Sequence, residues 1–137
     1  AFASGWQARD RTACADRPTL IEGIGRPRVE PGFIFEAVDA VEEIDDVESI
    51  AAAWLLEDLL GHRYGGSSGT NLVACLRLAE RMRARGEAGS IVSLLCDRGD
   101  RYDETLFDRD WLAGQGVNPE PALEALRARI ATAPVQR

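Results

Sequence analysis

The feature that most constrains the fold of this 137-residue sequence is a series of three glycine-bearing segments, set where the chain is expected to turn. They are residues 21–25 (Ile-Glu-Gly-Ile-Gly), 65–69 (Gly-Gly-Ser-Ser-Gly) and 95–102 (Leu-Cys-Asp-Arg-Gly-Asp-Arg-Tyr). Glycine turns at strand ends are typical of α/β folds, which bind their ligands at that position. The sequence therefore predicts an α/β layer with a ligand pocket.

Three short segments are expected to form β-strands. Residues 20–24 end at two glycines, and residues 40–44 precede a helical pattern. Residues 90–95 form a continuous apolar run, which suits a strand covered on both faces. The first 19 residues show no clear period and are expected to be loop or incomplete structure.

Three helices are expected from apolar residues that repeat every three or four positions. The first begins at Asp45 or Asp46 and ends at Gly61, where glycine favours a left-handed conformation. The second begins at a capping serine, Ser67 or Ser68, and ends at Gly86. The third opens at Asn118-Pro119 and turns three apolar residues inward, Leu123, Leu126 and Ile130.

This order of strands and helices predicts a three-layer αβα arrangement around a mainly parallel sheet. Three strands make a narrow sheet, and the sequence begins without Met in what resembles a connection. Residues 1–137 are therefore expected to be a single partial domain from the C-terminal part of a larger α/β enzyme.

The composition restricts the classes of partner. A net charge of −7 argues against nucleic acid, and no segment is long and apolar enough to span a membrane. The cluster of Arg77, Arg81, Arg83 and Arg85 is interpreted as a solvated helix face. The three cysteines show no Cys-x-x-Cys spacing, so the sequence predicts neither disulfides nor a metal site, and it predicts a reduced, cytoplasmic location.

The chain contains no lysine, because all 16 of its Lys and Arg residues are Arg. A lysine amine is the group that forms a Schiff base with a carbonyl compound. Any chemistry that needs such an amine cannot be completed by this chain alone.

The three segments together resemble a known family. They are similar to the Glu-Gly-Ile-Gly loop, the Gly-x-Ser-Ser-Gly helix start and the Pro-Asp-Ser-Gly-Glu-Arg-Tyr turn of the cysteine synthase and cystathionine β-synthase family of pyridoxal-phosphate enzymes. The resemblance runs in order from about Leu20 to Leu112 and is strongest to a bacterial branch of cysteine synthase-like or L-cysteine desulfhydrase-like proteins. It implies the fold type II, tryptophan synthase β-like architecture and the cofactor pyridoxal 5′-phosphate.

The resemblance also implies roles for particular residues. Gly23, Ile24 and Gly25 match the loop that borders the amino-acid substrate and the cofactor ring. Arg98 stands where the family has a serine that bonds the pyridine nitrogen. Two orientations stay open: Arg98 points inward as a donor to that nitrogen, or it faces solvent and leaves the nitrogen to Cys96 or a water.

The other residues of these segments are expected to be structural. Asp97, Asp100 and Arg101 are interpreted as a charge network that fixes the turn, and Tyr102 as a side chain packed under the loop. Taken alone, residues 65–69 are interpreted as a tight turn before a helix, with an anion site as the alternative.

By resemblance, the whole enzyme carries out β-replacement, joining an O-activated serine to sulfide, or β-elimination of L-cysteine to sulfide, pyruvate and ammonia. No catalytic residue is expected in this chain, since the Schiff-base lysine would belong to a missing N-terminal portion or a partner chain. A homodimer is the implied assembly, and a small amino acid is the implied substrate. The alternative is a non-catalytic, truncated or split relative that acts as a scaffold or partner subunit.

Overall fold

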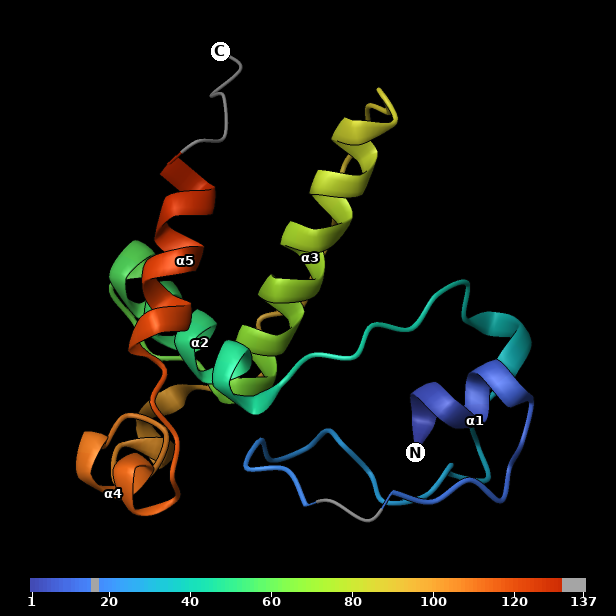
Figure 1. The fold of residues 1–137 in the computed structure, drawn as a ribbon, viewed down its shortest axis with the longest axis horizontal. Helices are drawn as coiled ribbons and strands as arrows, with labels where there is room; N and C mark the ends of the chain where they lie inside the picture. The colour runs from blue at the N-terminus through green and yellow to red at the C-terminus, as the bar shows by residue number, and fades with distance from the viewer. Residues whose placement is uncertain (16–17, 132–137) are drawn as a thin grey trace. The chain divides into compact units, whose positions relative to one another are not determined.

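The computed structural model of the chain describes residues 1–15 and 18–131. Two compact units are present, residues 1–43 and residues 44–137, and each is described by itself (Figure 1). The described residues are predominantly helical. Whether residues 1–137 form a single partial domain stays a prediction.

The first unit is organised around aromatic side chains. Helix α1 (Phe2–Ala8) and the 3-10 turn η1 (Phe35–Ala37) are its regular elements. The Phe33 ring meets the rings of Phe2 and Phe35 edge to face, with centroids 5.0 and 5.1 Å apart. The expectation of loop structure over residues 1–19 is thus wrong for α1, while residues 16 and 17 lie outside the described residues.

Helix α2 (Asp46–Leu60) forms the core of the second unit. Its residues from Ser49 to Leu56 are all buried, so the helix is covered on every side through its middle turns. Acidic residues occupy its first turn, and Gly61 ends it with a φ of 70°. The predicted boundaries of this helix are confirmed.

Helix α3 (Gly66–Ala84) packs on α2 at a point where both backbones lie unusually close. A Cβ atom on Gly69 would collide with the carbonyl oxygen of Ser49 and lie 2.7 Å from the backbone nitrogen of Ala53. The neighbouring α2 residues are alanines, which leave room for this approach. Val73, one turn further along α3, is fully buried.

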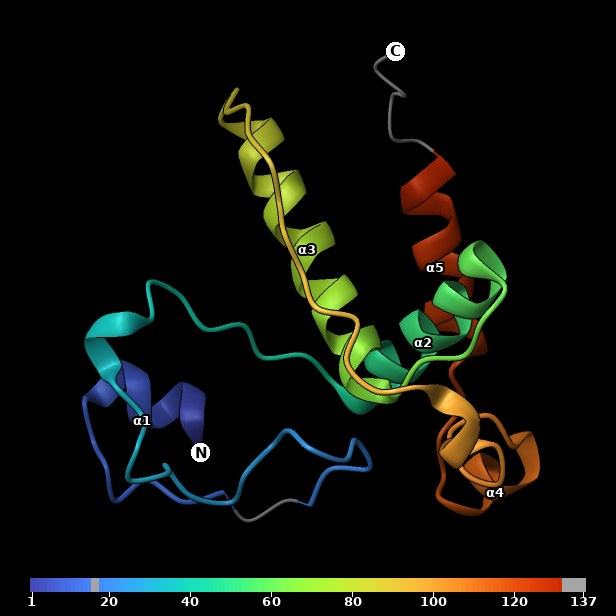
Figure 2. The same ribbon diagram turned by 180° about the vertical axis from the view of Figure 1, so that it is seen from behind.

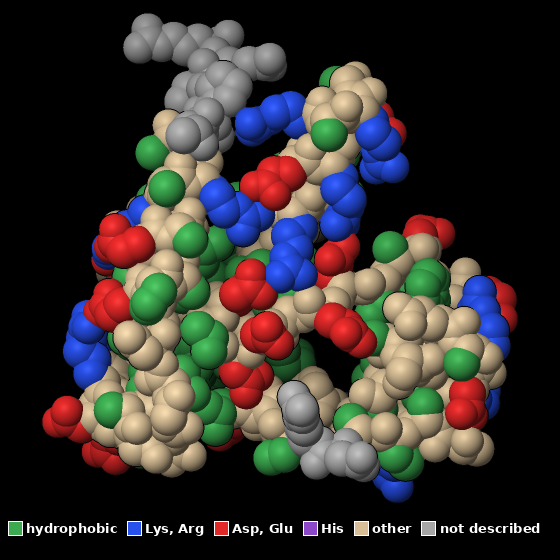
Figure 3. Space-filling model, viewed as in Figure 1, with side chains coloured by type: hydrophobic (Ala, Val, Ile, Leu, Met, Phe, Trp, Pro, Cys, Tyr) green, Lys and Arg blue, Asp and Glu red, His purple; other side chains and the backbone are tan. Residues whose placement is uncertain are grey.

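Two further helices complete the second unit. The 3-10 turn η2 (Gly99–Tyr102) leads to α4 (Arg109–Gly114), which Asp108 caps by accepting hydrogen bonds from two backbone nitrogens. Helix α5 (Glu120–Ala131) packs its buried Leu123 and Leu126 into the core and contacts α2. Asn118 precedes α5 and accepts from its first backbone nitrogen, which confirms the predicted start. Figure 3 shows basic and acidic side chains interleaved over α3 and α5.

The three expected strands are wrong for the described residues, which contain two isolated bridges and no β-strand. Residues 20–24 form bends and turns, because Gly23 has a φ of +82°. Residues 40–44 are irregular, and residues 90–95 run back along α3 as an extended segment (Figure 2). A strand needs neighbours for its backbone hydrogen bonds, and the three-layer sheet is not formed here.

None of the helices in the described part of the chain is long and apolar enough to cross a membrane.

Candidate functional site

The second and third glycine-bearing segments come together in the second unit. The backbone nitrogen of Gly65 donates to the carbonyl of Asp97 at 3.0 Å, and that of Gly99 donates to the carbonyl of Arg63 at 2.9 Å. An isolated antiparallel bridge joins Tyr64 to Arg98 between these bonds. The turn before α3 thus holds the turn that contains Arg98.

Glycine is required at the crossing of these two turns because atoms of one turn lie very close to the backbone of the other. A Cβ atom on Gly65 would collide with the carboxylate of Asp97 and lie 3.0 Å from the Tyr102 ring. A Cβ atom on Gly99 would lie 2.8 Å from the backbone carbon of Arg63. In the structure, the glycines of both segments allow one segment to approach the other.

Side chains of α3 hold the start of the third segment. Ser68 accepts a hydrogen bond from the backbone nitrogen of Cys96 at 2.8 Å. Asn71 donates to the carbonyl of Leu94 at 3.0 Å, and its amide nitrogen lies 3.6 Å from the sulfur of Cys96. The predicted role of Ser67 or Ser68 as the helix cap is wrong, since the N-cap residue is Gly65. Asn71 was not predicted, although it lies on the same helix face as Ser68, three residues away.

Tyr102 anchors the turn from below. Its side chain is buried, and its hydroxyl donates to the carboxylate of Asp97 at 2.7 Å. Arg101 lies over the Tyr102 ring, and Asp100 pairs with Arg98. The predicted packing of Tyr102 under the loop is confirmed. The predicted charge network of Asp97, Asp100 and Arg101 stays a prediction.

Arg63 fixes the other side of the crossing. Its guanidinium bonds Glu57 at 2.8 Å and Asp103 at 2.7 Å, and it lies 4.6 Å from the centroid of the Phe107 ring. The hydrogen bonds to Asp103 and Glu57 raise the pKa of Arg63 above its usual value. Arg63 is therefore a permanent cation that ties the end of α2 to η2.

Cys96 and Arg98 are displayed on the surface of this anchored segment. The Cys96 thiol is exposed, and the side chain of Arg98 is 76% exposed with its Nε 3.3 Å from Asp100. In this chain Arg98 thus has the solvent-facing orientation. The roles of both residues toward a cofactor stay predictions.

The first glycine-bearing segment belongs to the first unit and forms a tight turn there. Gly23 and Gly25 have φ values of +82° and +67°, and Ile24 is 37% exposed. A side chain on Gly25 would collide with Thr19, whose hydroxyl accepts from the backbone nitrogen of Ile21. This turn therefore requires glycine, but its proposed contact with a substrate stays a prediction.

A group of three or more potential metal ligands is not found among the described residues. At the crossing, Arg98 displays a guanidinium, which only donates hydrogen bonds, and Cys96 displays a thiol, which is a weak donor and a weak acceptor.

Comparison with known proteins gives a consistent result. L-cysteine desulfhydrase Cds1 of Mycobacterium tuberculosis is 47% identical over 106 residues, which are 77% of this chain and 29% of that protein. Cysteine synthase 1 of Neurospora crassa is 32% identical over 113 residues, 81% of this chain and 28% of that protein. An N-(2-amino-2-carboxyethyl)-L-glutamate synthase of Ralstonia nicotianae is 36% identical over 70% of this chain and 28% of its own length.

No family model matches the chain. The chain spans less than a third of the length of these curated relatives. Within that span the identity to the desulfhydrase is high and covers most of the sequence. The chain therefore belongs to the family of the cysteine synthases and L-cysteine desulfhydrases.

Proposed function

We propose that this chain is the C-terminal part of a longer, pyridoxal-phosphate-dependent enzyme of sulfur amino-acid metabolism. The observation that carries the proposal is the 47% identity to an L-cysteine desulfhydrase over 77% of the chain. The similarity to that relative favours β-elimination as the activity of the whole enzyme. In this reaction, L-cysteine and water give pyruvate, ammonia and sulfide. Similarity to cysteine synthases supports β-replacement as the second activity. A non-catalytic scaffold is not favoured, because these relatives are named as enzymes.

The residues at the crossing fit one part of the cofactor. A pyridine nitrogen accepts hydrogen bonds, and a guanidinium only donates them, so Arg98 suits that nitrogen where the family has a serine. Arg98 is exposed, and its partner Asp100 is also exposed, so the ion pair opens at little cost. Pyridoxal phosphate supplies the electron-withdrawing ring that makes loss of a β-substituent possible. In the alternative, Arg98 keeps facing solvent and the nitrogen is left to Cys96 or a water.

The lysine that holds this cofactor must come from elsewhere in the enzyme, since this chain contains none. The same missing part explains the extended apolar segment 90–95. Val92 is 91% exposed and Leu94 is 74% exposed. We infer that strands from the rest of the protein pair with this segment in a three-layer αβα fold. Gly23, Ile24 and Gly25 are assigned to the border of the substrate site.

A small amino acid is the proposed substrate, and a homodimer in the cytoplasm is the proposed assembly and location. The three cysteines show no spacing typical of a disulfide framework, and they are free thiols in the described residues.

The test uses the complete natural protein, loaded with pyridoxal phosphate. Sulfide release from L-cysteine is measured alongside cysteine formation from an O-activated serine and sulfide. We expect sulfide release to be the faster reaction. If the loaded protein catalyses neither reaction, the proposed function is wrong.

Arg98→Ser in that protein tests the assignment of Arg98. An inward Arg98 predicts a change in the absorbance of the bound cofactor, because the donor to the ring nitrogen changes. A solvent-facing Arg98 predicts unchanged spectra and rates within about threefold, which is under about 0.7 kcal/mol. Arg83→Ser, on the exposed surface of α3, is the matched control.

A further inference from the structure

Within the second unit, a cavity lies between α2, α4 and the first turn of α5, and no residue of the segments 65–69 and 95–102 lines it. Its volume is about 360 Å³, and its walls are mainly apolar. This volume lies at the small end of the range of about 300–1,000 Å³ that is typical of ligand pockets. The apolar walls come from five residues, Trp54, Leu112, Ala113, Val117 and Pro119.

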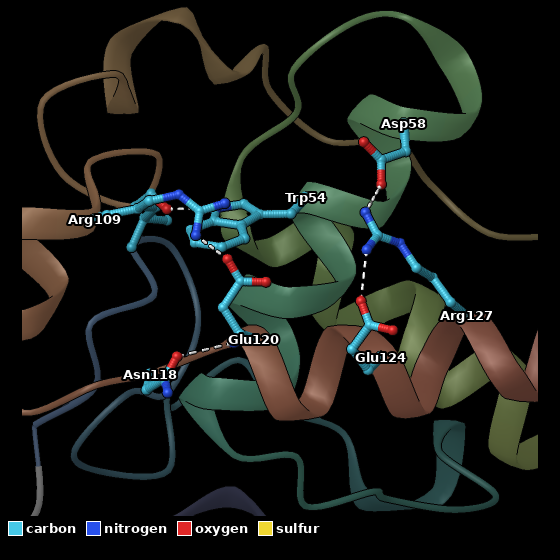
Figure 4. A network of polar contacts seen from close by, with 8 residues as sticks. Trp54, Asp58, Arg109, Asn118, Glu120, Glu124 and Arg127 are labelled. Atoms are coloured by element: carbon cyan, nitrogen blue, oxygen red, sulfur yellow. Dashed lines mark hydrogen bonds and ion pairs between the residues drawn. The ribbon is translucent and has the colours of Figure 1, made fainter.

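Two opposite charges stand side by side at this cavity. Arg109 begins α4 and Glu120 begins α5, and Figure 4 shows their side chains meeting beside the Trp54 ring. The Arg109 guanidinium lies 4.8 Å from the centroid of that ring. Both side chains reach solvent, with exposed fractions of 69% for Arg109 and 39% for Glu120.

The aromatic wall is held rigidly. Trp54 is 8% exposed, and its indole nitrogen donates to the carbonyl of Leu106 at 2.8 Å. Glu120 is positioned through its backbone nitrogen, which donates to the side-chain oxygen of Asn118. The cation, the carboxylate and the apolar wall therefore lie on well-anchored elements.

This arrangement matches the chemistry of a free α-amino acid. Such a molecule carries a carboxylate and an ammonium on one carbon, next to its side chain. The guanidinium of Arg109 binds a carboxylate through two parallel hydrogen bonds, and Glu120 accepts from an ammonium. An apolar side chain then fills the cavity along Leu112 and Val117.

The exchange of partners is inexpensive. An exposed ion pair contributes about 0–1 kcal/mol, so separating Arg109 from Glu120 costs little. Each of the two then regains a partner of opposite charge from the same ligand. A simple anion or a simple amine would leave one of them without its partner at the edge of an apolar cavity.

The adjoining cavity on the other side of Arg109 does not have these properties. Its volume is about 180 Å³, below the usual range for ligands, and most of its lining is charged. Arg127 closes it through ion pairs with Asp58 and Glu124 (Figure 4). Arg127 therefore provides a control residue that is close in space to Arg109 and has the same charge.

We propose that the cavity beside Trp54 binds a small apolar α-amino acid, with Arg109 holding its carboxylate and Glu120 its ammonium. The site is separate from the cofactor-binding residues assigned above, and the binding step involves no chemical change.

The test is calorimetric titration of the complete, cofactor-loaded protein with L-norleucine. This probe has an apolar side chain and no β-substituent that can be eliminated, so its binding does not depend on the proposed activity. We expect binding without a change in cofactor absorbance. We also expect much weaker binding of hexanoate, which lacks the ammonium, and of pentylamine, which lacks the carboxylate.

Variants locate the site. Arg109→Gln and Glu120→Gln are each expected to weaken norleucine binding by about tenfold or more, as loss of a charged hydrogen-bond partner predicts. Arg127→Gln is the matched control and is expected to leave binding unchanged. Ala113→Leu, which fills the cavity, is expected to abolish binding. Circular dichroism checks that each variant is folded.

Three results would overturn the proposal. The first is absence of norleucine binding to the unmodified protein. The second is equal binding by the protein and by its folded Glu120→Gln variant. The third is equal affinity for hexanoate and norleucine, which would make the cavity a site for apolar carboxylates instead of amino acids.

Discussion

Helix α2 and the extended segment 90–95 are both rich in apolar residues, yet the side chains in the middle turns of α2 are buried and those of the segment are exposed. In α2, Ile50 and the three alanines that follow it are 0% exposed. In the extended segment, Val92 is 91% exposed and Leu94 is 74% exposed. The difference lies in where each element finds its hydrogen-bond partners and its apolar neighbours.

A helix makes its backbone hydrogen bonds within itself, so α2 needs only packing partners, which α3 and α5 supply. An extended segment needs another strand on at least one edge. Within the described residues, the carbonyl of Leu94 bonds a side chain of α3, and the backbone nitrogen of Cys96 does the same. Across the part of the chain that the structure describes, the helical layer formed by α2, α3 and α5 buries its apolar side chains, whereas Val92 and Leu94 stay uncovered, which agrees with the sheet proposed above.

The largest effect is expected on the helical side of the comparison. Gly69→Ala places a methyl group against the backbone of α2 at Ser49 and Ala53, where no flexible side chain can move away. We expect it to lower the free energy of unfolding by about 3 kcal/mol, measured by urea denaturation. Gly114→Ala is the control, because a Cβ atom at Gly114 meets nothing within 4 Å. Equal stability of the two variants would mean that α2 and α3 do not cross as closely as described.

The second prediction compares the two sides directly through one side-chain change. Val73→Ala removes two methyl groups from a fully buried site and is expected to cost about 2 kcal/mol. Val92→Ala at an exposed site is expected to cost less than about 0.5 kcal/mol in this chain. In the complete protein, we expect the cost of Val92→Ala to approach that of Val73→Ala. A small cost there would argue against a sheet that covers residues 90–95.

The same contrast explains how far the sequence could predict the structure. The boundaries of α2 and the start of α5 were predicted, because caps and apolar spacing act within a few residues of the chain. The strands predicted over residues 20–24 and 90–95 are wrong for the described residues, because strand formation depends on partners that sequence periodicity does not report.

The candidate site was predicted in part for a related reason. The glycines at residues 65 and 99 and the packing of Tyr102 were visible as turn residues and a local aromatic. The contacts from Ser68 and Asn71 to the segment around Cys96 join positions about 25 residues apart. The pairing of Arg109 with Glu120 depends on how α4 and α5 meet, so no local pattern indicated it.

A third, smaller effect tests how the extended segment is anchored at its end. Tyr102→Phe removes the hydroxyl that donates to Asp97 and leaves the ring in place. We expect a loss of about 1–2 kcal/mol, since the acceptor is a partly buried carboxylate. Tyr64→Phe, at the isolated bridge between Tyr64 and Arg98, is the control. The rate of Cys96 alkylation, followed by peptide mass spectrometry, is compared between the parent protein and both variants. If it rises only in Tyr102→Phe, the hydrogen bond from Tyr102 to Asp97 holds the whole segment in place.

The smallest effect concerns the surface of the helical layer, where Arg129 bonds Glu80 through two nitrogens at 2.8 and 2.9 Å and so joins α5 to α3. The hydrogen bonds from Arg129 lower the pKa of Glu80 below its usual value of 4.5. Because the folded state favours the ionised form, the contribution to stability is complete above the unfolded pKa. It is lost as the pH falls through the lowered pKa of the folded state.

The Glu80 side chain is 51% exposed, so solvent screening limits the effect, and we expect Glu80→Gln to cost about 0.5 kcal/mol at neutral pH. The difference from the parent protein should shrink as the pH falls below 4.5 and also at high salt. Glu104→Gln changes the same charge at an exposed position outside this ion pair and should show a smaller difference. Urea denaturation at several pH values measures both variants. A difference in the free energy of unfolding that grows toward acid would contradict the lowered pKa of Glu80. A loss of stability as large as that of Gly69→Ala would mean that charge contributes more than close packing to the stability of the helical layer.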